Sequence, residues 1–118
     1  MTRYEHLLLV ASRLGQVEVS SEAADRAIHA ALGRNGPLLP YTTDEPYART
    51  LLPPGFEWMD VTPTDGGIYA PCRRTGLGAD GLAYPHHGQW GRTQMLSMCG
   101  GALRVWAMLA QMEKRRSW

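Results

Sequence analysis

The pattern of apolar and polar residues predicts a helix at the start of the chain. Apolar side chains recur there at steps of three and four, the spacing of a helix with one buried face, at Tyr4, Leu7, Leu8, Ala11 and Leu14. Thr2 and Glu5 have the spacing of a capping box, which satisfies backbone amides at a helix start. Gly15 is expected to end the helix in the left-handed conformation.

A second helix is expected soon afterwards and should end before Gly33. Ser20 or Ser21 can cap it, and Glu22 and Asp25 place negative charge near the positive end of its dipole. Its narrow, alanine-rich face is formed by Ala24, Ala27, Ile28, Ala31 and Leu32. Such a face permits close approach to a neighbouring element.

The middle of the chain predicts a short helix followed by a hairpin. The helix would begin at Thr43 as its cap and stop at residues 53–55, which are Pro-Pro-Gly. Strand-forming side chains follow at Phe56, Trp58 and Val61, and Asp65-Gly66-Gly67 is a strong turn signal before Ile68, Tyr69 and Ala70. We therefore expect residues 56–72 to form a hairpin.

The last third of the chain predicts an irregular segment and then the principal core helix. Residues 75–91 are rich in glycine and show no helical period, although Leu82, Ala83 and Tyr84 could form a third strand. Thr93 can cap a helix whose apolar stripe comprises Met95, Met98, Cys99, Ala102, Leu103, Trp106, Leu109 and Ala110. Because glycine disfavours helix, Gly100 and Gly101 indicate close packing on the sheet or a kink.

These elements predict one α+β domain spanning residues 1–118. We expect a small three-stranded, mostly antiparallel sheet layered with helices, in the manner of an α/β/α sandwich, and a long C-terminal core helix. A length of 118 residues with 44% hydrophobic residues suits such a core. The longest apolar run, Leu7 to Ala11, is too short to span a bilayer, and no secretory signal is recognised. With only two cysteines, the expected location is a reducing cytoplasm.

Charge is distributed unevenly along the chain. The net charge is +1, but residues 1–65 hold five bases and nine acids, whereas residues 66–118 hold seven bases and two acids. The near-neutral total argues against a dedicated polyanion binder. The basic second half suits docking of a charged partner, although opposite charges folded against each other would also account for it.

No pattern of residues indicates an enzyme or a metal centre. Residues 76–81 match the letters G-x-G-x-x-G, but Leu82-Ala83-Tyr84-Pro85 follows instead of the helix that a dinucleotide site requires. His86 and His87 lack the spacing of metal ligands, so we expect neither a metal nor a cofactor. Cys99 is expected in the core. Neighbouring arginines would favour the thiolate of Cys72, but no base is identifiable in the sequence, so an unreactive Cys72 is the favoured interpretation. A small enzyme that uses Cys72 or a histidine-bound metal remains an alternative.

The candidate binding residues gather between Arg73 and Arg92. Aromatic, histidine and arginine side chains on a loop are typical of binding hot spots. The residues are Arg73, Arg74, Tyr84, His86, His87, Trp90 and Arg92. A second interpretation is that the glycine-rich loop and the two arginines hold a nucleotide or another anion.

Four segments resemble the phage ABA sandwich domain, a family of small bacteriophage and prophage proteins. They are Asp25 to Gly33, Pro40 to Asp44, Leu52 to Trp58 and Ala102 to Ala107, and they span most of the chain. Between Arg73 and Arg92 the sequence departs from the pattern of the family. The resemblance implies a layered α/β domain of phage origin and supplies no catalytic residues.

These observations together predict a non-enzymatic phage or prophage accessory protein in the cytoplasm of a bacterial host. It would bind and inhibit a host protein or protein complex, for instance a defence complex, as an anti-CRISPR protein does. The alternatives are a protein that sequesters a nucleotide or other anion, and the small enzyme described above.

Overall fold

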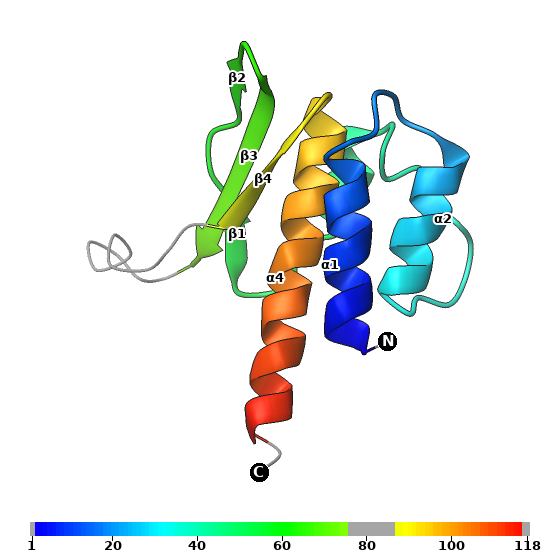
Figure 1. Cartoon of the computed structure of the whole chain (residues 1–118), viewed down its shortest axis with the longest axis vertical. Helices are drawn as coiled ribbons and strands as arrows, with labels where there is room; N and C mark the ends of the chain where they lie inside the picture. The colour runs from blue at the N-terminus through cyan, green and yellow to red at the C-terminus, as the bar shows by residue number, and fades with distance from the viewer. Residues whose placement is uncertain (1, 76–86, 117–118) are drawn as a thin grey trace.

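The chain folds into four helices and a four-stranded antiparallel sheet. A computed structural model describes residues 2–75 and 87–116. The elements are α1 (Arg3–Leu14), α2 (Glu22–Ala31), α3 (Glu45–Arg49), β1 (Phe56–Trp58), β2 (Thr62–Thr64), β3 (Gly67–Arg74), β4 (His87–Gly91) and α4 (Gln94–Arg116). Figure 1 shows the sheet, α4, α1 and α2 following one another across the molecule. The predicted α+β class and the long closing helix are confirmed.

Side-chain caps begin the helices largely as the sequence predicts. The Thr2 hydroxyl accepts a hydrogen bond from the Glu5 amide at 3.1 Å, and the Ser21 hydroxyl accepts one from the Ala24 amide at 3.0 Å. The Thr93 hydroxyl accepts one from the Leu96 amide at 3.2 Å at the start of α4. The second helix ends before Gly33, whose φ of 65° requires the freedom of glycine.

Two expectations about helix ends are wrong. Gly15 does end α1, but its φ of −69° is right-handed, so its backbone conformation does not require glycine. A Cβ at this position would lie 3.4 Å from the Trp90 carbonyl oxygen, which shows that α1 ends close against β4. The cap of α3 is Asp44 rather than Thr43. The amides of both residues bond to the Pro40 carbonyl, so Thr43 belongs to the preceding turn.

The long strand β3 is the centre of the sheet. Tyr69 is paired with Thr62 of β2 and with Trp90 of β4, while Cys72 is paired with Trp58 of β1 and again with β4. Strands β1 and β2 therefore lie end to end along one side of β3, and β4 lies along the other. The expected hairpin over 56–72 is present, but its first arm is divided.

A one-residue bulge divides this first arm. Three residues, 59–61, separate the pairs Trp58↔Cys72 and Thr62↔Tyr69, whereas only two separate the same pairs on β3. The extra residue interrupts the ladder, so Val61 lies outside the strand that the sequence predicts. Strand β4 was not expected, and it places Trp90 on the sheet rather than in a loop. The strand expected at Leu82 to Tyr84 lies outside the described residues.

Helix α4 forms the core between β3 and β4 on one side and α1 on the other. Leu7, Ala70, Leu96 and Leu103 are fully buried there. Gly101 permits the close approach, because a Cβ on it would lie 3.3 Å from the Ala70 carbonyl oxygen. The expected close packing of the glycine pair is thus confirmed. No helix within the described residues has the length and apolar character needed to cross a membrane.

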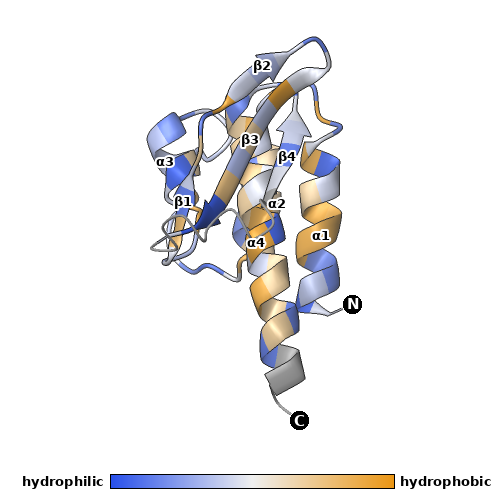
Figure 2. Cartoon of the chain, turned by 90° about the vertical axis from the view of Figure 1, so that its left-hand side faces the viewer, coloured by the Kyte–Doolittle hydropathy of each residue, from blue (hydrophilic) through white to orange (hydrophobic). Residues whose placement is uncertain are grey.

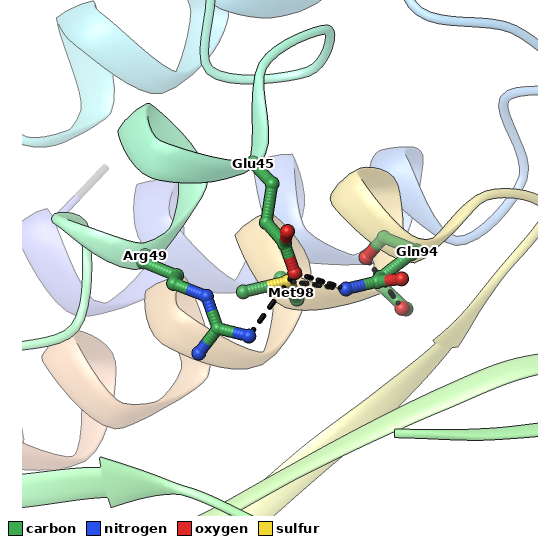
Figure 3. Close-up of polar contacts among 5 residues, drawn as sticks. Glu45, Arg49, Gln94 and Met98 are labelled. Atoms are coloured by element: carbon green, nitrogen blue, oxygen red, sulfur yellow. Dashed lines mark hydrogen bonds and ion pairs between the residues drawn. The ribbon is translucent and has the colours of Figure 1, made fainter. Parts of the chain in front are cut away.

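A polar network joins the short helix α3 to the start of α4 (Figure 3). One carboxylate oxygen of Glu45 accepts hydrogen bonds from Arg49 at 3.0 Å and from the Gln94 amide at 2.6 Å. The same Gln94 nitrogen lies 3.8 Å from the sulfur of Met98. Because each polar group has a partner within the network, we assign it to holding α3 in place.

Candidate functional site

The two arginines at the end of β3 belong to opposite faces of the sheet. Side chains alternate along a strand, so Arg73 and Arg74 diverge. Arg73 is paired with Glu57 in the ladder, and their side chains form an ion pair at 2.8 Å. Arg74 is paired with Phe56, and its guanidinium carbon lies 5.1 Å from the centre of that ring. The single arginine site expected from the sequence is therefore two sites.

Trp90 is the prominent side chain on the face that carries Arg73. Its ring centre lies 5.0 Å from that of Tyr69, its partner across the ladder, at an interplanar angle of 38°. Trp90 is 49% exposed. Gly88 makes room for the pair, because a Cβ on it would lie 2.7 Å from the Tyr69 hydroxyl oxygen. The aromatic pair is thus held in a defined position and remains accessible.

We call this surface the outer face, defined by Glu57, Thr62, Tyr69, Arg73 and Trp90. Among the described residues, the helices pack on the opposite face, and Figure 2 shows the strands in front of them. The opposite face carries Ala70, Cys72 and Gln89, all of which are buried. The outer face thus carries the exposed Trp90 beside the half-buried Tyr69, together with one ion pair.

The other predicted binding residues do not lie together on the outer face. Arg92 is exposed just beyond β4, next to Gly91, which is paired with Ile68. Arg74 follows Ile68 by six positions along β3, so Arg92 and Arg74 lie about 20 Å apart along the sheet. His87 stands in β4 opposite Cys72. Tyr84 and His86 lie outside the described residues.

Neither cysteine has the environment of a reactive thiol. Cys72 is fully buried, and desolvation raises its pKa to about 12. The expectation that neighbouring arginines favour the Cys72 thiolate is therefore wrong: one arginine pairs with Glu57 on the outer face and the other stacks on Phe56. Cys99 is buried in α4 as expected, and burial followed by the nearby Asp25 raises its pKa.

A buried carboxylate in α2 is one polar group whose role the sequence does not reveal. Asp25 is 6% exposed, and one of its oxygens accepts hydrogen bonds from the amide and the hydroxyl of Thr42, both at 2.8 Å. The expectation that Asp25 acts mainly on the helix dipole misses this contact. Ser20 donates a hydrogen bond to the Thr42 carbonyl. These bonds fasten the segment before α3 to α2, and they make Asp25 a structural residue.

Other candidate chemistry in the described part of the chain is sparse. No three His, Cys, Asp or Glu side chains within it come together as metal ligands do. A hollow at the far end of α4 contains Arg3 and Arg74, and sequence reasoning missed the former because the two arginines stand 71 positions apart.

Comparison with known proteins gives no family for the chain. No family model matches it, and neither a curated protein nor a solved structure does. The resemblance to the phage ABA sandwich domain therefore stays a prediction from the residues quoted above.

Proposed function

We propose that the chain is a non-enzymatic binding protein that docks on a protein partner through the outer face of its sheet. The observation that carries this proposal is Trp90, which is 49% exposed and held against Tyr69 on a face that no described helix covers. Tryptophan and tyrosine are enriched among the residues that dominate binding energy at protein interfaces.

The charge of this face favours a protein over a nucleic acid. Arg73 is neutralised by Glu57, so the ion pair leaves the defined surface without net charge. Affinity for a nucleic acid comes mainly from unpaired cations that contact phosphates. A central aromatic pair with a polar margin is instead the arrangement found in protein interfaces.

The resemblance in sequence supplies the class of partner in this proposal. A small phage accessory protein without catalytic residues acts by occupying a host target, so the partner we propose is a bacterial host protein, for instance part of a defence complex. This step rests on the resemblance alone.

The test is capture of a partner from a bacterial lysate with three forms of the protein. We expect the wild type and Tyr47→Ala to retain the same partner and Trp90→Ala to lose it. Tyr47 is a matched control because it is an aromatic residue of α3, 38% exposed and outside the outer face. The three melting temperatures should agree within a few degrees, because both rings are partly in water. Equal capture by Trp90→Ala, or no partner specific to the wild type, would contradict the proposal.

A further inference from the structure

A hollow lined by Arg3 and Arg74 lies where the start of α1, the end of β3 and the last turns of α4 meet. Its volume is about 270 Å³, and its walls come from the first turn of α1, the end of β3 and the last turns of α4. Arg3, Arg74 and Glu113 form its polar side, and Trp106, Leu109 and Met112 contribute its apolar side. Arginine and aromatic groups from three separate elements thus meet in one cavity.

An aromatic ring supports each guanidinium in this cavity. The guanidinium carbon of Arg3 lies 6.0 Å from the centre of the Trp106 ring, and that of Arg74 lies 5.1 Å from the centre of Phe56. A hydrogen bond from its indole nitrogen to the Leu51 carbonyl, at 2.7 Å, fixes Trp106. Both cations are therefore positioned by contacts that leave the N–H groups at their edges available.

Neither guanidinium has an acceptor in the part of the chain that the structure describes. Several other arginines do have acceptors: Arg26, Arg49 and Arg73 pair with glutamates, and Arg104 donates to Gln89 at 2.6 Å. Two guanidinium groups that line one cavity, neither with an acceptor among the described residues, are a suitable site for a phosphate or carboxylate, which accepts several charge-assisted hydrogen bonds at once.

We propose that this cavity binds a compact organic anion, a phosphate or carboxylate carried on an apolar ring. The anionic group lies between Arg3 and Arg74, and the ring lies against Trp106 and Leu109. The volume is at the small end of the range for ligand pockets, which excludes a dinucleotide. This site is separate from the outer face and does not depend on the function proposed for it.

Phenyl phosphate is the probe for this site, and isothermal titration calorimetry measures its binding. We expect Arg3→Gln and Arg74→Gln each to weaken binding about tenfold, as the loss of a charge-assisted hydrogen bond does. Arg13→Gln is the matched control, because Arg13 is an exposed arginine of the same helix that does not line the cavity, and it should bind as the wild type does. Glu113→Gln should tighten binding because it removes the negative charge from the lining.

Two further ligands separate the contributions of anion and ring. Benzoate should bind at the same site, and inorganic phosphate should bind more weakly than phenyl phosphate because it leaves the apolar wall uncovered. The proposal is overturned if millimolar phenyl phosphate produces no heat of binding, or if it binds Arg3→Gln and Arg74→Gln as tightly as Arg13→Gln. Equal affinity for inorganic and phenyl phosphate would overturn the assignment of the ring. Trp90→Ala should leave all these affinities unchanged, which keeps the test independent of the outer face.

Discussion

Gly100 shows how one residue can set the distance between a helix and a sheet. A Cβ on Gly100 would lie 2.5 Å from the amide carbon of Gln89. Gln89 cannot simply move aside, because its side chain donates to the Ala11 carbonyl and accepts from Arg104, both at 2.6 Å. The glycine therefore makes room for a buried glutamine that links α1, β4 and α4.

We expect Gly100→Ala to destabilise the protein in spite of the better helix propensity of alanine. Overpacking costs about 1–3 kcal/mol, and the gain in propensity is about 1 kcal/mol, so the net loss should reach up to about 2 kcal/mol. The free energy of unfolding from urea denaturation measures it. In a Gln89→Ala background the obstacle is gone, and the same substitution should become stabilising. A stabilising effect of Gly100→Ala in the wild-type background would refute this account.

At this scale the sequence predicts the fact of close packing but not its cause. Glycines at Gly100 and Gly101 inside an apolar stripe indicate an approach to another element. The sequence of α4 does not identify Gln89 as the group that fills the space. That contact depends on β4, which the sequence does not predict because it follows the glycine-rich segment. Asp25 is a similar case, since its acceptor role depends on Thr42, 17 positions away.

At the scale of elements, the bulge between β1 and β2 explains why the first arm of the hairpin is divided. Trp58 shares the helix-packed face with Cys72, and Thr62 shares the outer face with Tyr69. An uninterrupted strand would put both residues on the same face, because they are an even number of positions apart. The extra residue corrects this mismatch, and Val61 packs against the core as a result.

Deletion of Asp60 should convert β1 and β2 into one continuous strand. Removing one residue between Trp58 and Thr62 restores regular alternation and brings both pairings into a single register. We expect the variant to fold with a free energy of unfolding within about 1 kcal/mol of the wild type, because Asp60 is exposed. Hydrogen exchange should show stronger protection at the Met59 and Thr62 amides, which face β3 in the continuous ladder.

The control for this deletion is removal of Pro71 from β3. That change shifts the rest of a regular strand by one position, so buried and exposed side chains exchange faces and the fold should be lost. If removal of Asp60 unfolds the protein as removal of Pro71 does, the bulge is not the reason for the interruption.

The sequence predicts the candidate site only where it also predicts the strands that carry its residues. The sequence predicts Trp90 as a candidate contact residue on a loop, whereas the structure places it on β4 with a side chain that is 49% exposed. The sequence does not separate Arg73 from Arg74, because the predicted strand stops at Cys72 and leaves both arginines in a loop. Once β3 extends to Arg74, alternation alone assigns them to different faces. The sequence places Tyr69 in a strand but not in a site, because it does not predict β4, the strand that carries its partner Trp90.

At the scale of the whole molecule, the division of charge along the chain survives folding. Of the three ion pairs between described residues, Arg26–Glu22 and Arg49–Glu45 are local pairs within helices. Only Arg73–Glu57 joins the acidic residues 1–65 to the basic residues 66–118. The unequal halves are nevertheless held together by apolar contacts, because α1 packs on α4 and β1 and β2 pair with β3.

Separate chains of residues 1–65 and 66–118 should therefore assemble into the native fold. The break falls in the turn between β2 and β3, where Gly66 has no neighbour that a Cβ would meet. Each half alone lacks a partner for its apolar surface and should give the circular dichroism of an unfolded chain. Mixing should restore the helical signal. The affinity between the two halves should fall several-fold between about 0.1 and 1 M salt, because salt shortens the range of electrostatic attraction from about 10 Å to 3 Å.

A matched control removes the attraction without removing the fold. Halves in which exposed Glu18 and Glu22 are changed to Gln should still assemble, with a weaker dependence on salt. Halves that stay apart at low salt, or whose affinity does not respond to salt, would show that the opposite charges play no part in bringing the two regions together.

The packing of α1 against α4 also has a consequence for how the protein is made. A ribosome synthesises α1 before any other of these elements and α4 after all of them, yet α4 covers both α1 and the buried face of β3. Until α4 has emerged, Leu7, Ala70 and Cys72 have no apolar layer above them. The nascent domain therefore exposes these apolar side chains until α4 is made, and we expect its cooperative folding to begin only when α4 has left the exit tunnel.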